Sequence, residues 1–135
     1  MRTLIIEAVN HPFDLHWWQW GKIVGLLLPL ICFSLGINHP LVWGVAVHFL
    51  LDFTFQTSQT VAGKARCDWW VLAYHAFISG GYTGLLVGGL AGLLVGVIIH
   101  LAVDSTNKFG LDEPAGPAID QALHILTLVA IWRLL

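Results

Sequence analysis

Pairs of a histidine and an aspartate, four residues apart, recur inside long apolar segments of this chain and restrict its fold more than any other feature. There are three such pairs, the last in reversed order: His48 and Asp52, His100 and Asp104, and Asp120 and His124. Residues four apart lie on one face of an α-helix, so each pair can converge on one object. Ionisable groups inside apolar helices are costly unless they are paired or bound, and the pairs therefore indicate a functional site.

The scarcity of charge indicates an integral membrane protein. Hydrophobic residues make up 57% of the 135 residues and charged residues 10%, whereas a soluble domain has about 25% charged residues. We expect residues 1–135 to form a single membrane domain, an all-α polytopic bundle of about five short transmembrane helices. The net charge of −2 offers no basic surface, so no nucleic-acid partner is expected. Membrane lipid is the expected partner.

Apolar segments and the turn signals between them predict where the helices lie. Residues 1–16 are expected to form an interfacial segment. The predicted transmembrane helices are residues 17–37, 41–57, 70–86, 89–105 and 118–135. The stretch between the second and third of these helices, up to Asp68, is expected to be a polar loop.

The region from Trp69 to Asp104 fits either one long helix or a hairpin of two. One helix would be about 50 Å long, more than a bilayer core of about 30 Å requires, and would hold His75 and His100 about 37 Å apart. A break in the glycine-rich stretch 84–89 would instead bring all the polar groups to one membrane level. We therefore expect the hairpin.

Glycines at four-residue spacing predict close helix packing in the same region. The spacing runs through Gly80, Gly84, Gly88, Gly92 and Gly96. Small residues at this spacing let membrane helices approach closely. Packing within one chain would use them, and so would a homo-oligomer or a larger membrane complex.

The distribution of Lys and Arg predicts the orientation of the bundle. In the five-helix topology one residue, Arg133, falls on the side opposite the polar groups. The other basic residues fall on the same side as the polar groups: Arg2, Lys22, Lys64, Arg66 and Lys108. Because cytoplasmic loops carry the excess of basic residues, the polar side is expected to face the cytoplasm. The N-terminus is then cytoplasmic and the C-terminus periplasmic, in the inner membrane.

The predicted site is a divalent-metal centre. In each of the three pairs the histidine lies deeper in the membrane than the carboxylate, an order that unrelated core histidines would have no reason to share. Histidine and carboxylate are ligands of zinc and similar ions. The candidate ligands are His48, Asp52, His75, His100, Asp104, Asp120 and His124.

These candidates exceed what one tetrahedral ion needs. They suit two ions, or one ion whose imidazoles are oriented by the remaining carboxylates. Gln56, Lys108 and Gln121 are expected to hydrogen-bond the ligands or to face the substrate. Two metal-free alternatives remain open, namely a structural His–Asp network and a proton relay. Ligation of haem or chlorin is disfavoured, because an axial histidine does not need a carboxylate beside it.

Taken together, the motifs resemble a family of small bacterial and phage membrane proteins of unknown function. The pattern is HxxxDFxxQ, a loop lysine, a lone helix histidine, HxxxDxxxK and DQxxH, over about residues 41–135. The matching residues are His48, Asp52, Phe53, Gln56, Lys64, His75, His100, Asp104, Lys108, Asp120, Gln121 and His124. This resemblance implies no activity. A more distant similarity, to membrane-bound metal-dependent hydrolases with helix-borne HxxxD pairs, implies metal-assisted hydrolysis.

The favoured function is therefore a metal-dependent hydrolase of a lipid-linked or interfacial phosphate or ester. The metal would activate water, and Asp52, Asp104 or Asp120 would act as the catalytic base or as a ligand. The alternative is a non-enzymatic membrane subunit, or a transporter that passes protons or metal ions through the His/Asp network.

Overall fold

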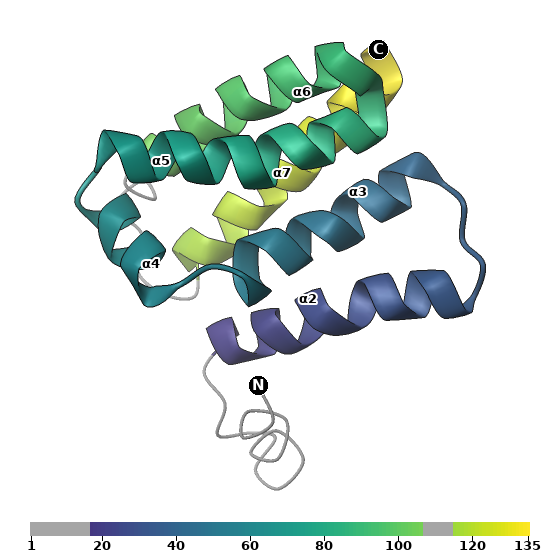
Figure 1. The fold of residues 1–135 in the computed structure, drawn as a ribbon, viewed down its shortest axis with the longest axis horizontal. Helices are drawn as coiled ribbons and strands as arrows, with labels where there is room; N and C mark the ends of the chain where they lie inside the picture. The colour runs from purple at the N-terminus through teal and green to yellow at the C-terminus, as the bar shows by residue number, and fades with distance from the viewer. Residues whose placement is uncertain (1–16, 107–114) are drawn as a thin grey trace, which may run out of the picture.

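The structure, a computed structural model, describes residues 17–106 and 115–135, and its secondary structure over these ranges is entirely helical (Figure 1). The elements, with π-helical segments labelled η, are α2 (Trp17–Ser34), α3 (Pro40–Phe49), η1 (Leu50–Thr54), α4 (Ser58–Ala65), α5 (Trp69–His75), η2 (Ala76–Gly81), α6 (Tyr82–Ser105) and α7 (Ala115–Leu134). The all-α prediction is confirmed. The interfacial segment predicted for residues 1–16 lies outside the described residues.

The helices form a bundle in which α6 is central to the packing. Helix α2 packs against α3 and η1, α3 packs against α6, and α7 packs against both α6 and α3. Pro40 opens α3, a position where proline removes no hydrogen bond that the helix would use. Figure 1 shows α2 and α3 side by side and α7 crossing behind the α5–α6 pair.

Helix α6 is a hairpin rather than a straight rod. The backbone leaves helical geometry at Gly88 (φ −134°, ψ 20°) and Gly89 (φ 63°, ψ −151°). Glycine adopts the positive φ at Gly89 without a steric penalty. The reversal falls in the stretch 84–89, where the glycine-rich sequence predicts a break, and Figure 1 shows the second arm of α6 returning beside α5.

Glycines line the contact between the two arms of this α5–α6 hairpin, whose first arm runs from α5 through η2 into α6. A Cβ atom on Gly84 would collide with the carbonyl of Gly92, and one on Gly80 would collide with the carbonyl of Gly96. Gly88 faces α7 instead, where a Cβ atom would meet Cγ2 of Ile131. Backbone therefore packs on backbone along most of the hairpin.

The expected polar loop between the second and third predicted helices is wrong over most of its length, because Ser58–Ala65 forms α4. The sequence of α4 has no continuous apolar face, so its hydrophobic pattern does not reveal a helix. Its N-terminus is capped locally, since the Thr57 hydroxyl accepts a hydrogen bond from the Thr60 N–H at 3.1 Å. Asp68 caps α5 in the same way, through the backbone N–H of Trp70.

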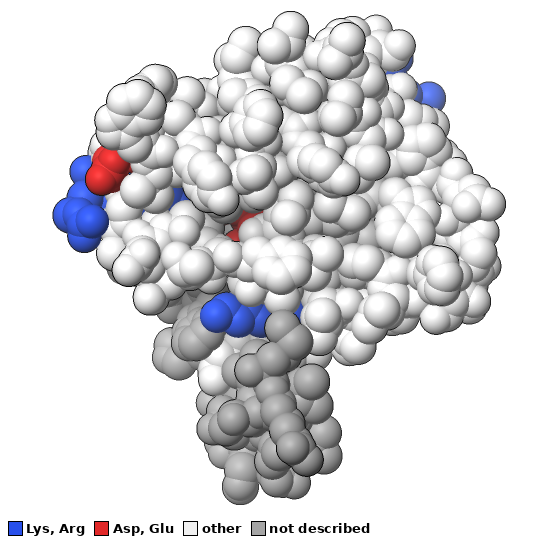
Figure 2. All heavy atoms as spheres, in the orientation of Figure 1, with Lys and Arg blue, Asp and Glu red and all other residues white. Residues whose placement is uncertain are grey.

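Polarity in this bundle is inverted relative to a soluble protein. Among the described residues, the fully buried polar side chains outnumber the buried apolar ones, and they are His48, Asp52, His75, Ser79, Thr83, His100, Asp104, Asp120 and His124. Large apolar side chains lie outside, among them Phe33 and Leu90, each 78% exposed. Figure 2 shows a face with few charged atoms over most of its area.

One helical stretch in the described chain, Trp69–Ser105, is long and apolar enough to cross a membrane. It has 37 residues and includes both arms of the hairpin. Gln19–Ser34 and Pro40–Thr54 are shorter apolar helices.

Candidate metal centre

Two π-helical segments position the first ligands of the candidate site. Segment η1 carries Asp52, and η2 begins directly after His75. In η1 the N–H of Phe55 donates to the carbonyl of Leu50, five residues earlier, at 3.1 Å. Such wide turns are rare in helices and occur often at functional sites. They were not predicted, because a π turn leaves no mark in hydrophobic periodicity.

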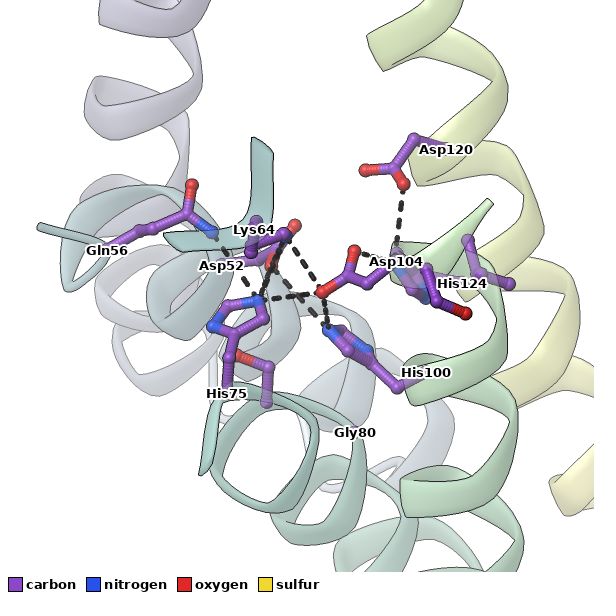
Figure 3. Close-up of polar contacts among 12 residues, drawn as sticks. Asp52, Gln56, Lys64, His75, Gly80, His100, Asp104, Asp120 and His124 are labelled. Atoms are coloured by element: carbon purple, nitrogen blue, oxygen red, sulfur yellow. Dashed lines mark hydrogen bonds and ion pairs between the residues drawn. The ribbon is translucent and has the colours of Figure 1, made fainter. Parts of the chain in front are cut away.

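The structure brings the seven candidate ligands together inside the bundle, and Figure 3 shows most of them converging. Each is at most 6% exposed. They come from different elements: His48 from α3, Asp52 from η1, His75 from α5, His100 and Asp104 from α6, and Asp120 and His124 from α7. The arms of the hairpin place the imidazole rings of His75 and His100 with centroids 5.1 Å apart, whereas one straight helix would separate them by about 37 Å.

The first set of ligands is Asp52, His75 and His100. One ligand atom from each lies within 4.8 Å of the others. Nε2 of His75 is 2.7 Å from Oδ1 of Asp52, and Nε2 of His100 is 3.8 Å from the same oxygen. These residues can hold a metal ion between η1, α5 and α6.

A second set overlaps the first and consists of His100, Asp104 and His124. Nε2 of His100 is 3.5 Å from Oδ2 of Asp104, and Nε2 of His124 is 3.7 Å from Oδ1. The rings of His100 and His124 are stacked, with centroids 3.9 Å apart. Asp52, Asp120 and His124 form a third set that links the other two. The donor groups therefore surround more than one point.

The donor set fits a divalent transition metal. Two ligand atoms that bind the same ion, each at about 2 Å, lie at most about 4 Å apart. The distances from the Asp104 oxygens to Nε2 of His100 (3.5 Å) and to Nε2 of His124 (3.7 Å) fall in that range. Within the described residues, Nε2 of His100 and Nε2 of His124 are buried and have no hydrogen-bond partner. Leaving buried polar atoms unsatisfied costs about 1–3 kcal/mol each, and a bound metal would satisfy both.

Lys64 is the residue of this site that the sequence analysis missed. Its side chain is 10% exposed, and Nζ lies 2.9 Å from Oδ2 of Asp104 and 4.0 Å from Oδ1 of Asp52. Nζ is also 3.3 Å from Nε2 of His75. Burial lowers the pKa of Lys64, but the carboxylates of Asp52 and Asp104 outweigh burial and raise the pKa above its usual value. Figure 3 shows Lys64 between the two aspartates.

A signal for Lys64 was present in the sequence. The lysine belongs to the motif pattern described above, but it was placed in the predicted polar loop and was not counted among the site residues. Because α4 is a helix rather than a loop, it directs the side chain into the carboxylates. The site thus contains a cation of its own.

Gln121 connects several members of the site by hydrogen bonds. Its Nε2 donates to Oδ2 of Asp52 and, at 3.3 Å, to Oδ2 of Asp120. Its Oε1 lies 3.2 Å from Nε2 of His48. His48, a predicted ligand, belongs to none of the ligand sets found among the described residues, and its imidazole contacts the Gln121 amide instead.

The other polar groups differ in how far they can be placed. Nε2 of Gln56 lies 3.4 Å from Nε2 of His75, at the edge of the site. Lys108 lies outside the described residues. A small cavity of about 10 Å³ borders the site, and its lining includes His48, His100, His124 and the hydroxyl-bearing residues Thr83 and Thr127. This volume is close to the minimum that one water molecule needs.

Figure 2 shows acidic atoms in a hollow of a face that carries few charged atoms. The fold and the site together define an all-α protein with a buried centre rich in histidine and aspartate.

Comparison with known proteins places this chain in a family. Residues 41–135 match the sequence profile described as "Protein of unknown function (DUF3307)", and the chain belongs to this family. The matched range covers every predicted ligand, and the prediction of membership in a family of unknown function is confirmed. Comparisons with curated proteins and with solved structures give no match.

Proposed function

We propose that this protein is a membrane-embedded metal-dependent hydrolase that acts on a lipid-linked or interfacial phosphate or ester. The observation that carries the proposal is the overlap of the ligand sets at His100. Overlapping sets of three donors suit one ion or two neighbouring ions, whereas hydrogen bonding alone leaves Nε2 of His100 without a partner. The nearby ammonium of Lys64 adds a group that can bind an anion.

The inverted polarity of the bundle supports a location in the membrane. A bundle with polar residues inside and exposed Phe33, Leu90 and Leu134 outside would expose a large apolar area to water. Lipid would cover that area without a cost. In this proposal all five predicted helices cross the inner membrane, and the His/Asp centre faces the cytoplasm, where it meets lipid headgroups.

The chain's own residues supply most of the proposed chemistry. A bound divalent ion would activate water and polarise the scissile bond. Asp52 and Asp120 are held in position by Gln121, and either carboxylate could accept a proton from an attacking water. The apolar walls around them would exclude other water molecules and strengthen electrostatic interactions in the site.

A second candidate is a metal-free polar network with a structural or proton-relay role. It is favoured by the close contacts that already balance charge, namely His75 with Asp52 at 2.7 Å and Lys64 with Asp104 at 2.9 Å. In this reading Lys64 takes the place of a metal permanently. The two candidates differ in whether the purified protein binds metal.

Elemental analysis of detergent-purified protein tests the proposal. The wild type should contain about one or two equivalents of a divalent transition metal, and Asp104→Asn should reduce both the metal content and the hydrolysis of phosphomonoester and carboxylic ester probes in lipid micelles. Asp68→Asn is the matched control, because Asp68 caps α5 away from the ligand sets and asparagine caps helices equally well. A wild type without metal, even after incubation with zinc or manganese, would contradict the proposal.

A further inference from the structure

We propose that Lys64 is an exchangeable internal cation, which neutralises the aspartates in the metal-free protein and binds the phosphate group of the substrate when metal is present. This inference rests on the proposed function and makes its substrate a phosphate ester rather than a carboxylic ester. It assigns a ligand-binding role to a side chain that lies among the candidate metal ligands without being one of them.

The position of the Lys64 ammonium is the first support. It lies 2.9 Å from Asp104 and 4.0 Å from Asp52, and these carboxylates belong to different ligand sets. A divalent ion bound by the same carboxylates would repel an ammonium a few ångströms away, strongly so in a buried site. Lysine and metal therefore compete for Asp104, and metal binding should release the lysine.

The way in which α4 is attached is the second support. Helix α4 packs mainly against α5, with Gly63 seated on the side chain of Val71. Among the described residues, α4 contributes no member to the ligand sets. Lysine carries its charge on a flexible four-carbon stem, so the ammonium can turn away from Asp104 while the bundle keeps its packing.

In the two-ion form of the site, the charge favours an anionic substrate. Because histidines that bind a metal are neutral, the charge of the site is set by the buried aspartates (Asp52, Asp104 and Asp120) and Lys64, which together carry about two negative charges. Two divalent ions would reverse this to about two positive charges, which a phosphomonoester of charge about −2 balances. A neutral carboxylic ester would leave the excess positive charge buried and uncompensated, which is costly.

The test compares metal affinity with phosphate affinity in protein purified with its full chain. Inorganic phosphate is the probe, with zinc affinity measured by competition with a chromophoric chelator and phosphate affinity measured by calorimetry on the zinc-loaded protein. Lys64→Met should bind zinc about tenfold more tightly and phosphate about tenfold more weakly, a coupling of ordinary size. Lys64→Arg, which keeps the charge, should retain phosphate binding.

Arg66→Met is the matched control, because Arg66 is exposed at the end of α4 and its loss removes one positive charge away from the site. It should change neither affinity. Tighter zinc binding together with weaker phosphate binding is specific to the exchange of cations. If Lys64 had a purely structural role, its removal would lower both affinities.

The outcomes separate this inference from the proposed function. A wild type that binds no zinc overturns both. If the wild type binds zinc, two results overturn the role of Lys64 alone. In one, Lys64→Met binds phosphate as tightly as the wild type, and in the other it loses both its zinc affinity and its phosphate affinity.

A measurement on the wild type covers the case in which Lys64→Met does not fold. The rate at which an amine-specific reagent modifies Lys64, followed by mass spectrometry, should rise on addition of zinc and fall again when phosphate is added. A modification rate that zinc leaves unchanged would show that the lysine is not displaced, and would overturn the inference.

Discussion

The two ends of the α5–α6 hairpin bury their interiors in opposite ways. At the turn end, Gly84 and Gly92 pack backbone against backbone, with Ile131 of α7 beside them. At the other end, His75 and His100 belong to a cluster of charged and polar groups. Close packing without polar side chains stabilises a bundle directly, whereas buried charges stabilise it only when they are well paired. The turn end therefore stabilises the bundle by close packing, and the other end holds the candidate metal site.

The largest effect is expected at the turn end. Gly92→Leu would drive a side chain into the carbonyl of Gly84, and overpacking of a tight contact costs about 1–3 kcal/mol or more. We expect a strong loss of thermal stability in detergent, regardless of metal. Leu94→Phe is the control, since Leu94 is 62% exposed on the same arm. Equal stability of Gly92→Leu and the wild type would show that the arms do not pack as described.

The next effect belongs to the site end and has the reverse pattern. His100→Gln removes the residue shared by the first two ligand sets, so zinc affinity should fall by more than about 100-fold, beyond the 10- to 100-fold typical of groups that only orient ligands. Thermal stability without metal should change little in comparison with Gly92→Leu. His39→Gln, at an exposed histidine that contacts Trp132, should keep the zinc affinity of the wild type. A stability loss at His100 as large as that at Gly92 would remove the distinction between the two ends.

A smaller effect is expected at Gln121. Gln121→Leu leaves the candidate ligands in place but removes the hydrogen bonds to Asp52, Asp120 and His48. Zinc affinity should fall about tenfold, as for other groups that orient metal ligands. Titration of zinc against a competing chelator measures this change. An effect as large as that of His100→Gln would mean that Gln121 itself binds the ion.

The smallest perturbation is a reporter fusion, which tells which side of the membrane each end faces. A reporter after Leu135 should be periplasmic and one near Lys64 cytoplasmic, because the basic residues concentrate on the side of the site. Both reporters on one side would contradict the five-helix topology.

The features that could be predicted from the sequence are those set by local backbone geometry. The i, i+4 spacing of His100 and Asp104 and the glycine-rich break near Gly89 act through local backbone geometry, and local geometry can be read from spacing. Helix α4 could not be found from hydrophobic spacing, because its sequence has no continuous apolar face and its packing on Val71 is a contact of the folded chain. The inward position of Lys64 depends on α4 and was missed for that reason.

The metal preference and the substrate cannot be read from the sequence for a related reason. The π turns in η1 and η2 set the fine positions of Asp52 and His75. A side chain displaced by about 1 Å can separate a working site from an idle one. Composition and periodicity predict that the histidines and aspartates lie together, but they do not predict side-chain positions to about 1 Å.

The reversal at Gly88 and Gly89 also bears on how the protein is made. In the proposed topology, a hairpin can insert into the lipid turn-first as one unit during synthesis. Its apolar tip then crosses the membrane while its base stays on the cytoplasmic side. Asp104 and His75 lie near that base, so neither would have to traverse the hydrocarbon, where translocon-based scales assign an aspartate about 2.5–3.5 kcal/mol. The bend that brings the site residues together would thereby let the charged groups reach their positions without crossing the hydrocarbon core of the membrane.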